Sequence, residues 1–229
     1  GDFVNDAPWC RLLGGERLLK LMSDRGYDAM GIGENEFIEG PEGLARAAAG
    51  ARFPLLCANY RVKGTPLEGV IRQSVIRIVG GIRIGIFGLG LRLSDHLQLE
   101  KYDGVLYGDP SEWAERMVQH LRQRYRCDYI ICLSHLGHHY SDGRIDDLKL
   151  ASHVEGIDLI IGGHTHTFLE APVAVNNPGG GVTWITQAGH SGVRLGRIDL
   201  IVGPEGEIHE QVAGFYSIRE ETGRATNLM

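Results

Sequence analysis

Short runs of apolar residues alternate along this chain with segments in which apolar residues recur every three or four positions. The runs at residues 128–133 and 157–161 are apolar almost throughout, which is typical of strands buried on both faces of a parallel sheet. The other apolar runs are shorter, and each of them predicts a strand. These further predicted strands are residues 28–32, 53–58, 75–79, 82–87, 183–187 and 197–202.

The segments between the predicted strands carry helix signals. One of them places Leu18, Leu19 and Met22 at helical spacing, and another is rich in alanine and begins at Pro41, a favoured residue in a first turn. The predicted helices are residues 15–25, 41–49, 109–125 and 145–153. The alternation of strands and helices predicts an α/β layered domain with helices outside the sheet. In such domains, sites form at the carboxyl ends of strands.

Composition and charge restrict the classes of function. The chain has 229 residues, of which 43% are hydrophobic and 23% charged, and this is ordinary for a folded domain. The formal net charge is −6, whereas a non-specific nucleic-acid binder is normally basic, so nucleic-acid binding is not expected. No apolar run reaches about 18 residues, and therefore no membrane span is predicted.

Glycine is unusually frequent, with 33 residues, which is roughly twice its average share. Such a chain is expected to contain many tight turns and close backbone approaches. Gly85, Gly88 and Gly90 are interpreted as turn glycines, because their spacing does not match a dinucleotide-binding loop and no helix signal follows them. Cys57 and Cys132 lie in apolar runs and are expected in the core.

Histidines gather at the ends of two predicted strands. His135 follows the strand at residues 128–133, and His164 and His166 follow the strand at residues 157–161. Neutral imidazole is the commonest nitrogen ligand of transition metals. The two glycines before His164 permit a sharp turn, so that His164 and His166 can leave it in different directions toward two neighbouring ions. The competing interpretation is that these are loop histidines without a ligand role.

A binuclear hydrolytic site also requires a carboxylate that bridges two ions about 3.5–4 Å apart and balances their charge. Asp2 and Glu34 are the candidates at predicted strand ends. Considered alone, Asp2 is an ordinary solvated charge near a terminus. Only the wider pattern of motifs assigns it to the site.

A series of motifs runs through most of the chain. The most specific are Ser-His-Leu-Gly at residues 134–137 and Ile-Gly-Gly-His-Thr-His at residues 161–166. The others are Gly-Asp-Phe at residues 1–3, the segments 26–30, 33–37, 53–54, 58–60 and 156–160, and Gln-Ala-Gly at residues 187–189. In order and spacing the set resembles the calcineurin-like metallophosphoesterases, in the branch of 5'-nucleotidases and 2',3'-cyclic phosphodiesterases. The resemblance extends over residues 1–202.

This resemblance implies a sandwich of two sheets flanked by helices, apparently without its first strands. It implies that Asp2 is the bridging carboxylate and that His166 belongs to the first metal. Glu34, His135 and His164 are implied to hold the second metal. The implied reaction is attack of a metal-bridging hydroxide on a phosphoester, with two divalent ions as Lewis acids. Histidine and carboxylate ligands suit Mn, Zn or Fe.

The chain departs from the family pattern in two places. The opening Asp-x-His motif of the family, which supplies two ligands of the first metal, lies before Gly1. The chain is therefore expected to be a single, N-terminally truncated metallophosphoesterase domain over residues 1–229. The family also has Gly-Asn-His-Glu where this chain has Gly-Glu-Asn-Glu at residues 33–36.

The second departure affects catalysis directly. Asn35 replaces the histidine that the family uses to stabilise the transition state and to protonate the leaving group. Loss of general-acid help typically costs about 10²–10⁴-fold in rate. Glu34 replaces a neutral ligand by a carboxylate, which still binds a hard cation but adds negative charge beside the phosphate.

These observations lead to hypotheses of different classes. The first is a metal-dependent phosphoesterase that hydrolyses nucleotides or related phosphomonoesters and cyclic phosphodiesters, with Asn35 at the catalytic position. The alternative is a catalytically impaired pseudo-enzyme, or a regulatory or binding module of the same fold. A mononuclear zinc hydrolase unrelated to the family is a third hypothesis.

Other histidines and acids near the motifs have open assignments. His138 and His139 are either surface residues or substrate-facing residues, since their loop starts at the site. His190 is a further candidate for a site contact, because it follows the Gln-Ala-Gly motif. Glu36 is interpreted as a carboxylate that positions the backbone.

The implied partner is a small-molecule phosphoester, with a nucleotide as the first expectation. Two-domain members of the family hold the nucleotide with a C-terminal domain, and too few residues follow Val202 to form one. That domain is therefore expected to be absent from this chain, and either a separate chain or a part of the protein beyond the given end would supply it. Family members are usually exported, so a periplasmic or surface location is implied by the resemblance.

Overall fold

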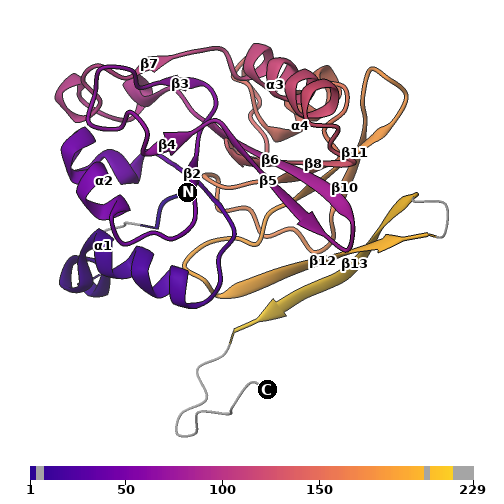
Figure 1. Cartoon of the computed structure of the whole chain (residues 1–229), viewed down its shortest axis with the longest axis horizontal. Helices are drawn as coiled ribbons and strands as arrows, with labels where there is room; N and C mark the ends of the chain where they lie inside the picture. Colours follow the sequence, from indigo (N-terminus) through magenta and orange to yellow (C-terminus); the bar gives the residue numbers. More distant parts are fainter. Residues whose placement is uncertain (4–7, 204–206, 219–229) are drawn as a thin grey trace, which may run out of the picture.

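Six strands form the central sheet of the computed structural model (Figure 1). The structure describes residues 1–3, 8–203 and 207–218. The strands of the sheet are β5 (Ser74–Val79), β6 (Ile82–Gly90), β8 (Tyr129–His135), β9 (Leu159–Ile161), β10 (Val173–Asn176) and β11 (Val182–Thr186). Their order is β10-β11-β9-β8-β6-β5. The inner strands run parallel, and the antiparallel strands β5 and β10 form the edges.

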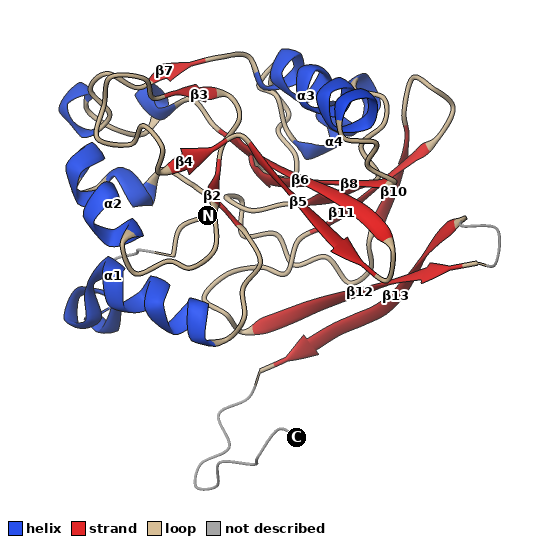
Figure 2. Cartoon of the chain, in the orientation of Figure 1, coloured by secondary structure: helices blue, strands red, loops and turns tan. Residues whose placement is uncertain are grey.

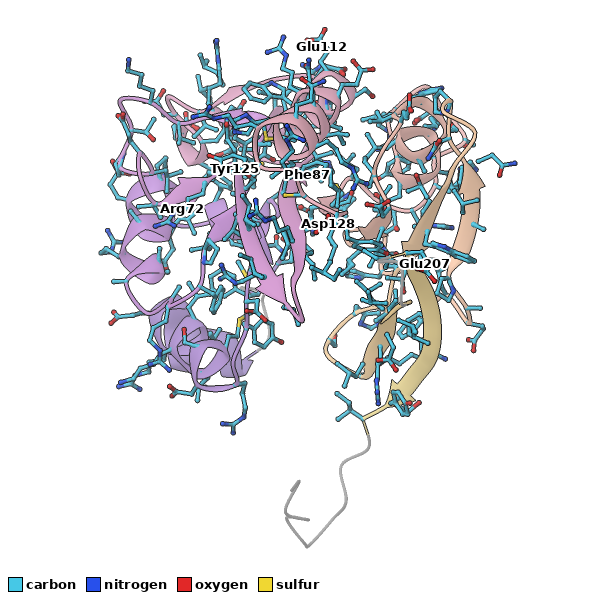
Figure 3. The ribbon with its side chains drawn as sticks, turned by 45° about the vertical axis from the view of Figure 1, so that its right-hand side comes forward. Arg72, Phe87, Glu112, Tyr125, Asp128 and Glu207 are labelled. Carbon is cyan, nitrogen blue, oxygen red and sulfur yellow. The ribbon has the colours of Figure 1, made fainter. Side chains whose placement is uncertain are left out.

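Helices α3 (Pro110–Gln119) and α4 (Asp147–His153) cover one face of this sheet (Figure 2). Phe87, Ile130 and Cys132 of the sheet are fully buried in one apolar cluster with Met117 of α3 and Leu150 of α4. The Phe87 side chain lies beneath α3 (Figure 3). The apolar runs that predicted β6, β8 and β9 therefore reflect burial in the layer between sheet and helices.

A second, smaller sheet lies beside the central one. Its three parallel strands are β1 (Met30–Gly31), β2 (Leu55–Leu56) and β4 (Ile71–Arg72), in the order β1-β2-β4. Helices α1 (Pro8–Asp24) and α2 (Gly40–Ala48) lie outside it (Figure 1). Leu19 of α1 and Leu44 of α2 join Phe37 and Leu55 in a second buried cluster. Each sheet thus has its own apolar core.

The two sheets meet along β6. Gly88 lies against the backbone of Leu56, and Gly90 lies against the ring of Tyr60, so that a Cβ at either glycine would overlap its neighbour. The interpretation of Gly85, Gly88 and Gly90 as turn glycines is wrong, because all three lie inside β6, which continues to Gly90. Glycine is required at position 88 because β2 of the second sheet approaches the strand so closely, and at position 90 because Tyr60 of the segment after β2 does.

Asn59 connects the segment after β2 to the end of β6. Its Nδ2 donates a hydrogen bond to the carbonyl of Gly90 at 2.7 Å, and its Oδ1 accepts one from the N–H of Gly90 at 2.8 Å. The side chain is fully buried. The N–H of Ala58 also donates to the carbonyl of Gly88 at 2.7 Å. Hydrogen bonds from the segment after β2 therefore join the second sheet to β6 of the central sheet.

Two antiparallel ladders complete the described strands. One pairs β3 (Tyr60–Arg61) with β7 (Leu106–Tyr107), and the other pairs β12 (Arg194–Val202) with β13 (Ile208–Ser217). The β12–β13 ribbon lies at one side of the molecule (Figure 3). The short helical turns are η1 (Asn35–Phe37), η2 (Leu93–Asp95), η3 (Leu99–Lys101) and η4 (His120–Arg124). Among the described helices, none is long and apolar enough to cross a membrane.

The predicted α/β architecture, with two sheets and flanking helices, is confirmed. Every predicted strand and helix overlaps an observed element. Cys57 and Cys132 are buried in the core, as expected. The strands β3, β4, β7, β10 and β13 were not predicted.

A buried carboxyl group fixes the end of β8. Asp147 is the first residue of α4, is fully buried, and accepts a hydrogen bond from Ser134 Oγ at 2.5 Å. Burial raises the pKa of Asp147 to about 7, although the hydrogen bond from Ser134 acts in the opposite direction. Because Ser134 precedes His135, this contact restrains the strand end at which His135 lies.

Replacing Asn59 by Leu should destabilise the fold. Leucine cannot pair with Gly90, so the buried N–H of Gly90 loses its partner, and the free energy of unfolding should fall by about 1–3 kcal/mol. Urea denaturation measures this change. The matched control is Asn176→Leu, at an exposed position of β10. An equal loss of stability in both variants would contradict the role assigned to Asn59.

Replacing Asp147 by Asn should remove a pH dependence of stability. The folded pKa of Asp147, about 7, lies above its ordinary value of 3.8, so the folded state binds an extra proton between these values. The stability contributed by this group therefore falls as pH rises toward 7, by up to about 1.4 kcal/mol per pH unit. Asparagine still accepts from Ser134 but does not titrate.

The unfolding free energy of Asp147→Asn, relative to that of the wild type, should therefore increase as the pH is raised from about 5 to about 7. Urea denaturation of both proteins at several pH values tests this. Parallel pH profiles would mean that Asp147 titrates normally in the folded state.

Candidate metal centre

Four side chains predicted as metal ligands come together at the carboxyl ends of β1, β8 and β9. They are Asp2, Glu34, His135 and His164, and one ligand atom of each lies within 4.8 Å of the others. Glu34 follows β1, His135 is the last residue of β8, and His164 follows β9. The site thus lies at the strand ends at which an α/β domain was expected to form it.

Glu34 makes the most contacts within this group. Its Oε2 lies 2.9 Å from His135 Nε2, and its Oε1 lies 3.0 Å from His164 Nδ1. Asp2 Oδ2 lies 3.1 Å from the same nitrogen of His135. Two carboxylates therefore face one imidazole nitrogen, which carries one hydrogen atom at most.

The pKa values of the group reflect these contacts. Burial acts to raise the pKa of Glu34, but the hydrogen bonds with His135 and His164 outweigh burial and hold this pKa well below its usual range. Burial acts to lower the pKa of His135, but its contacts with Asp2 and Glu34 outweigh that effect and raise it. The carboxylates thus attract positive charge to this point of the molecule.

This donor set fits a divalent transition-metal ion. Carboxylate oxygens and imidazole nitrogens are the ligands of such ions, and two carboxylates balance the charge of one dication. The ligand atoms also surround a position without a side chain, since a Cβ at Gly33 would overlap Asp2 Oδ1 and His135 Nε2. The buried Nδ1 of His135 has no hydrogen-bond partner among the described residues, so it can carry the ring hydrogen and leave the Nε2 lone pair to an ion.

Glu36 holds the backbone around this group. Its side chain is buried, and its Oε2 accepts hydrogen bonds from the N–H of Gly33 at 2.6 Å and from the N–H of Asp2 at 2.8 Å. The N–H of Asn35 donates to Asp2 Oδ1 at 3.0 Å. Burial raises the pKa of Glu36, and the neighbouring charge of Asp2 adds to this effect. Glu36 therefore positions the backbone on both sides of the centre, in agreement with its interpretation from the sequence.

Gln187 holds the turn that carries His164 and His166. The side chain is buried, its Nε2 donates to the carbonyl of Gly163 at 2.6 Å, and its Oε1 accepts from the N–H of Thr167 at 2.6 Å. His164 and His166 have φ angles of 70° and 54°, which residues other than glycine rarely adopt. Such a backbone persists where the surroundings enforce it, and Gln187 does so from both sides of the turn.

The role of Gln187 was missed by sequence reasoning. It belongs to the Gln-Ala-Gly motif, and that motif was the only signal for it. His96 was also missed. Its ring packs edge-on against that of His164, with 5.1 Å between the centroids. No motif in the surrounding segment indicates this contact.

His166 does not join the group of four. Its ring lies beside that of His190, with 5.0 Å between the centroids, and His190 in turn contacts the ring of Phe168. His190 therefore contacts a predicted ligand, as considered from the sequence. The structure does not bring His166 together with Asp2 in one ligand cluster.

The other candidate residues lie around the centre. Asn35 is half-buried in η1, and its side chain makes no hydrogen bond to a described residue. His139 is exposed, with Nδ1 3.6 Å from a carboxylate oxygen of Asp146. His138 is half-buried, and burial lowers its pKa. Neither of these histidines belongs to the metal-binding group.

Several known proteins similar to this chain are named as phosphoesterases or nucleotidases. No protein-family model matches it. It is 30% identical over 224 residues to the trifunctional nucleotide phosphoesterase protein YfkN of Bacillus subtilis, which covers 83% of this chain and 15% of that protein. It is 29% identical over 227 residues to a snake venom 5'-nucleotidase of Gloydius brevicauda, which covers 91% of this chain and 37% of that protein.

Among solved structures, the chain is similar to a 5'-nucleotidase precursor of Thermus thermophilus. The TM-score is 0.76 at 30% identity, over 87% of this chain and 40% of that one. The chain thus spans between 15% and 40% of the length of these relatives. The similarity to these relatives, in sequence and in fold, agrees with the family resemblance that the motifs indicate. The chain belongs with the calcineurin-like phosphoesterases, in the branch of the 5'-nucleotidases.

Proposed function

We propose that this chain is the metal-binding domain of a phosphoesterase that hydrolyses nucleotides or related phosphomonoesters and cyclic phosphodiesters. The observation that carries the proposal is the group of Asp2, Glu34, His135 and His164, because it unites the most specific motifs at one point. The names of the relatives, a nucleotide phosphoesterase and 5'-nucleotidases, support nucleotides as the substrate class.

The proposed ligands act at two neighbouring positions. Glu34, His135 and His164 would hold one ion, and Asp2 would bridge it to a second ion that His166 helps to hold. Divalent ions such as Mn, Zn or Fe, when bound, supply Lewis acidity and lower the pKa of water. The protein keeps the ligand atoms in place through Glu36 and the turn around His164.

Asn35 has a defined but limited part in this proposal. It lies next to Glu34, and its amide can donate a hydrogen bond to a phosphate oxygen. It cannot give a proton to the departing oxygen, because an amide is not an acid in this pH range. The proton must come from solvent or from a neighbouring group, so hydrolysis should favour leaving groups that depart as stable anions.

A second candidate function is a binding or regulatory module that retains metal and fold but turns over poorly. Two residues favour it. Asn35 supplies no proton, and Glu34 adds negative charge where a phosphate would approach. Activity of the wild-type chain with added metal separates the two candidates.

Location and partners are also proposals. The similarity to a 5'-nucleotidase from snake venom supports an exported protein. The partner is proposed to be a small phosphoester, because the relatives are named as a nucleotide phosphoesterase and as 5'-nucleotidases.

Hydrolysis should depend on metal bound by the group of four. The assay is phosphate release from a 5'-mononucleotide and a 2',3'-cyclic nucleotide, with metal content measured by elemental analysis. We expect at least one ion per chain, loss of activity with a chelator, and recovery with Mn²⁺. His164→Asn should lose at least one ion and more than about tenfold in rate, by removing a metal ligand.

His120→Asn is the matched control, at an exposed position of η4 away from the centre. It should retain wild-type metal content and rate. Phosphate release at the same rate from metal-free and metal-loaded protein would rule out the proposed mechanism.

Asn35→His should restore a general acid. The rate should rise about 10²–10⁴-fold for alkyl phosphates, and less for p-nitrophenyl phosphate, because a good leaving group needs less protonation. Measuring kcat over a series of leaving groups tests this, with Asn35→Gln as the control that keeps the amide. Activity that appears only in Asn35→His would favour the binding module. If kcat depends on the leaving group in the same way in Asn35→His and in the wild type, position 35 does not contact the leaving group.

A further inference from the structure

The loop between β8 and α4 encloses one ammonium group, which belongs to Lys149 of α4. Three backbone carbonyl oxygens accept hydrogen bonds from it, those of Tyr140 at 2.9 Å, Asp142 at 3.0 Å and Arg144 at 2.8 Å. A carboxylate oxygen of Asp146 lies 2.7 Å from the same nitrogen. Four oxygens therefore lie within 3.0 Å of a group that has only three hydrogen atoms to donate. Such a set resembles the oxygen shell of a bound cation.

The four oxygens come from alternate positions of the loop, residues 140, 142, 144 and 146. Calcium-binding loops of the EF-hand type also take ligands from alternate positions. The distances here, 2.7–3.0 Å, exceed the usual Ca²⁺–oxygen distance of about 2.3–2.6 Å. Carbonyl oxygens replace the hydration shell of K⁺ in selectivity filters. The loop is therefore suited to a larger cation of single charge, such as ammonium or potassium.

Asp146 supplies the negative charge of this shell and is fully buried. Its carboxylate also accepts hydrogen bonds from the N–H of Tyr140 and from the N–H of Lys149, each at 2.8 Å. Burial acts to raise the pKa of Asp146, but these hydrogen bonds and the Lys149 ammonium outweigh burial and lower it. The guanidinium of Arg144 is paired at 2.9 Å with Asp142, so Lys149 supplies the cation for Asp146.

The same loop contacts the turn that carries His164. The N–H of His138 donates a hydrogen bond to Thr165 Oγ1 at 2.9 Å, and Thr165 directly follows His164 in the chain. A Cβ at Gly137 would overlap both the hydroxyl of Tyr140 and the methyl group of Thr165. A displacement of the loop would therefore displace the turn, and with it a proposed metal ligand.

We propose that residues 140–146 form a loop for a monovalent cation, that its resident cation is the ammonium group of Lys149, and that the loop positions the turn of His164. The positioning rests on the proposed metal-binding function, whereas the cation loop stands on its own contacts. The Lys149 side chain is 29% exposed, so a small cation from solvent can reach the four oxygens once this side chain is truncated.

Lys149→Ala removes the resident cation and leaves the loop sequence unchanged. In choline chloride this variant should unfold about 5 °C or more below the wild type, because a buried carboxylate loses its partner. Potassium or ammonium chloride at the same ionic strength should restore most of the loss, since choline is too large to enter the shell. Lys149→Met fills the space without a charge, so potassium should not rescue it. The matched control is Lys20→Ala, at an exposed position of α1, which should unfold like the wild type in every salt.

The wild-type chain provides a measurement that needs no variant. In an NMR spectrum of the lysine ammonium groups, that of Lys149 should exchange its hydrogens slowly with water, because four oxygens enclose it. The exposed ammonium group of Lys20 should exchange much faster.

The affinity for Mn²⁺ tests the positioning of the turn. A titration followed by the electron paramagnetic resonance signal of free Mn²⁺ should show that folded Lys149→Ala binds the ion about tenfold more weakly in choline chloride than in potassium chloride. The wild type should bind Mn²⁺ equally well in both salts. Circular dichroism establishes that the variant is folded at the temperature of the titration.

Each outcome decides one part of the proposal. Equal unfolding temperatures of Lys149→Ala in choline and potassium chloride overturn the cation loop, and so does rescue of Lys149→Met by potassium. An ammonium group of Lys149 that exchanges as fast as that of Lys20 also overturns it. If the Mn²⁺ affinity of folded Lys149→Ala is the same in both salts, the positioning of the turn is overturned. If the wild type binds no Mn²⁺ while potassium rescues Lys149→Ala, the proposed function and the positioning fail and the cation loop stands.

Discussion

The negative charge of Asp2 and Glu34 is the constraint on which the arrangement of the strand ends depends. Both carboxylates lie against His135, and Glu34 also reaches His164. Two partly buried carboxylates repel one another strongly, so they stay this close only where donors or a cation compensate them. The imidazoles and the N–H of Asn35 compensate part of this negative charge. The negative charge that stays uncompensated is suited to the proposed divalent cation.

Each of the two strands that carry a histidine ligand ends on a buried polar contact. Ser134 and Asp147 restrain the end of β8, next to His135. Gln187 restrains the turn after β9, on which His164 lies. These contacts are made within the protein and need no ion. The ligand atoms are therefore organised before binding, which reduces the free-energy cost of ordering them when an ion arrives.

The sequence predicted the parts of the fold whose pattern is local. Continuous apolar runs predicted β8 and β9, because burial on both faces leaves that signature. The strands β3, β4 and β7 have two residues each, and their pairing depends on distant segments, so no local pattern could predict them. Gly88 and Gly90 were misinterpreted because a glycine that admits a close neighbouring segment has the same local context as one in a turn.

The same distinction applies to the site. Strand ends and histidine clustering indicated His135 and His164 from the residues themselves. Asp2 had no local signal and entered only through the family pattern, since its partners lie far away in the chain. His96 acquires its place through contact with a distant turn, and no spacing encodes such a contact.

The hydrogen-bonded pair of Asp2 and His135 spans 133 positions of the chain. Closing a loop of that length has an entropic cost, which the packing of the small sheet against the large one offsets. No short fragment of the chain can therefore assemble the centre, because its ligands come from both ends of this separation. Metal at about 100 times its Kd would add about 2.7 kcal/mol to the folded state alone. The proposed metal affinity would thus be linked to the folding equilibrium, so that a substitution at the contact between the sheets should weaken ion binding without changing a ligand.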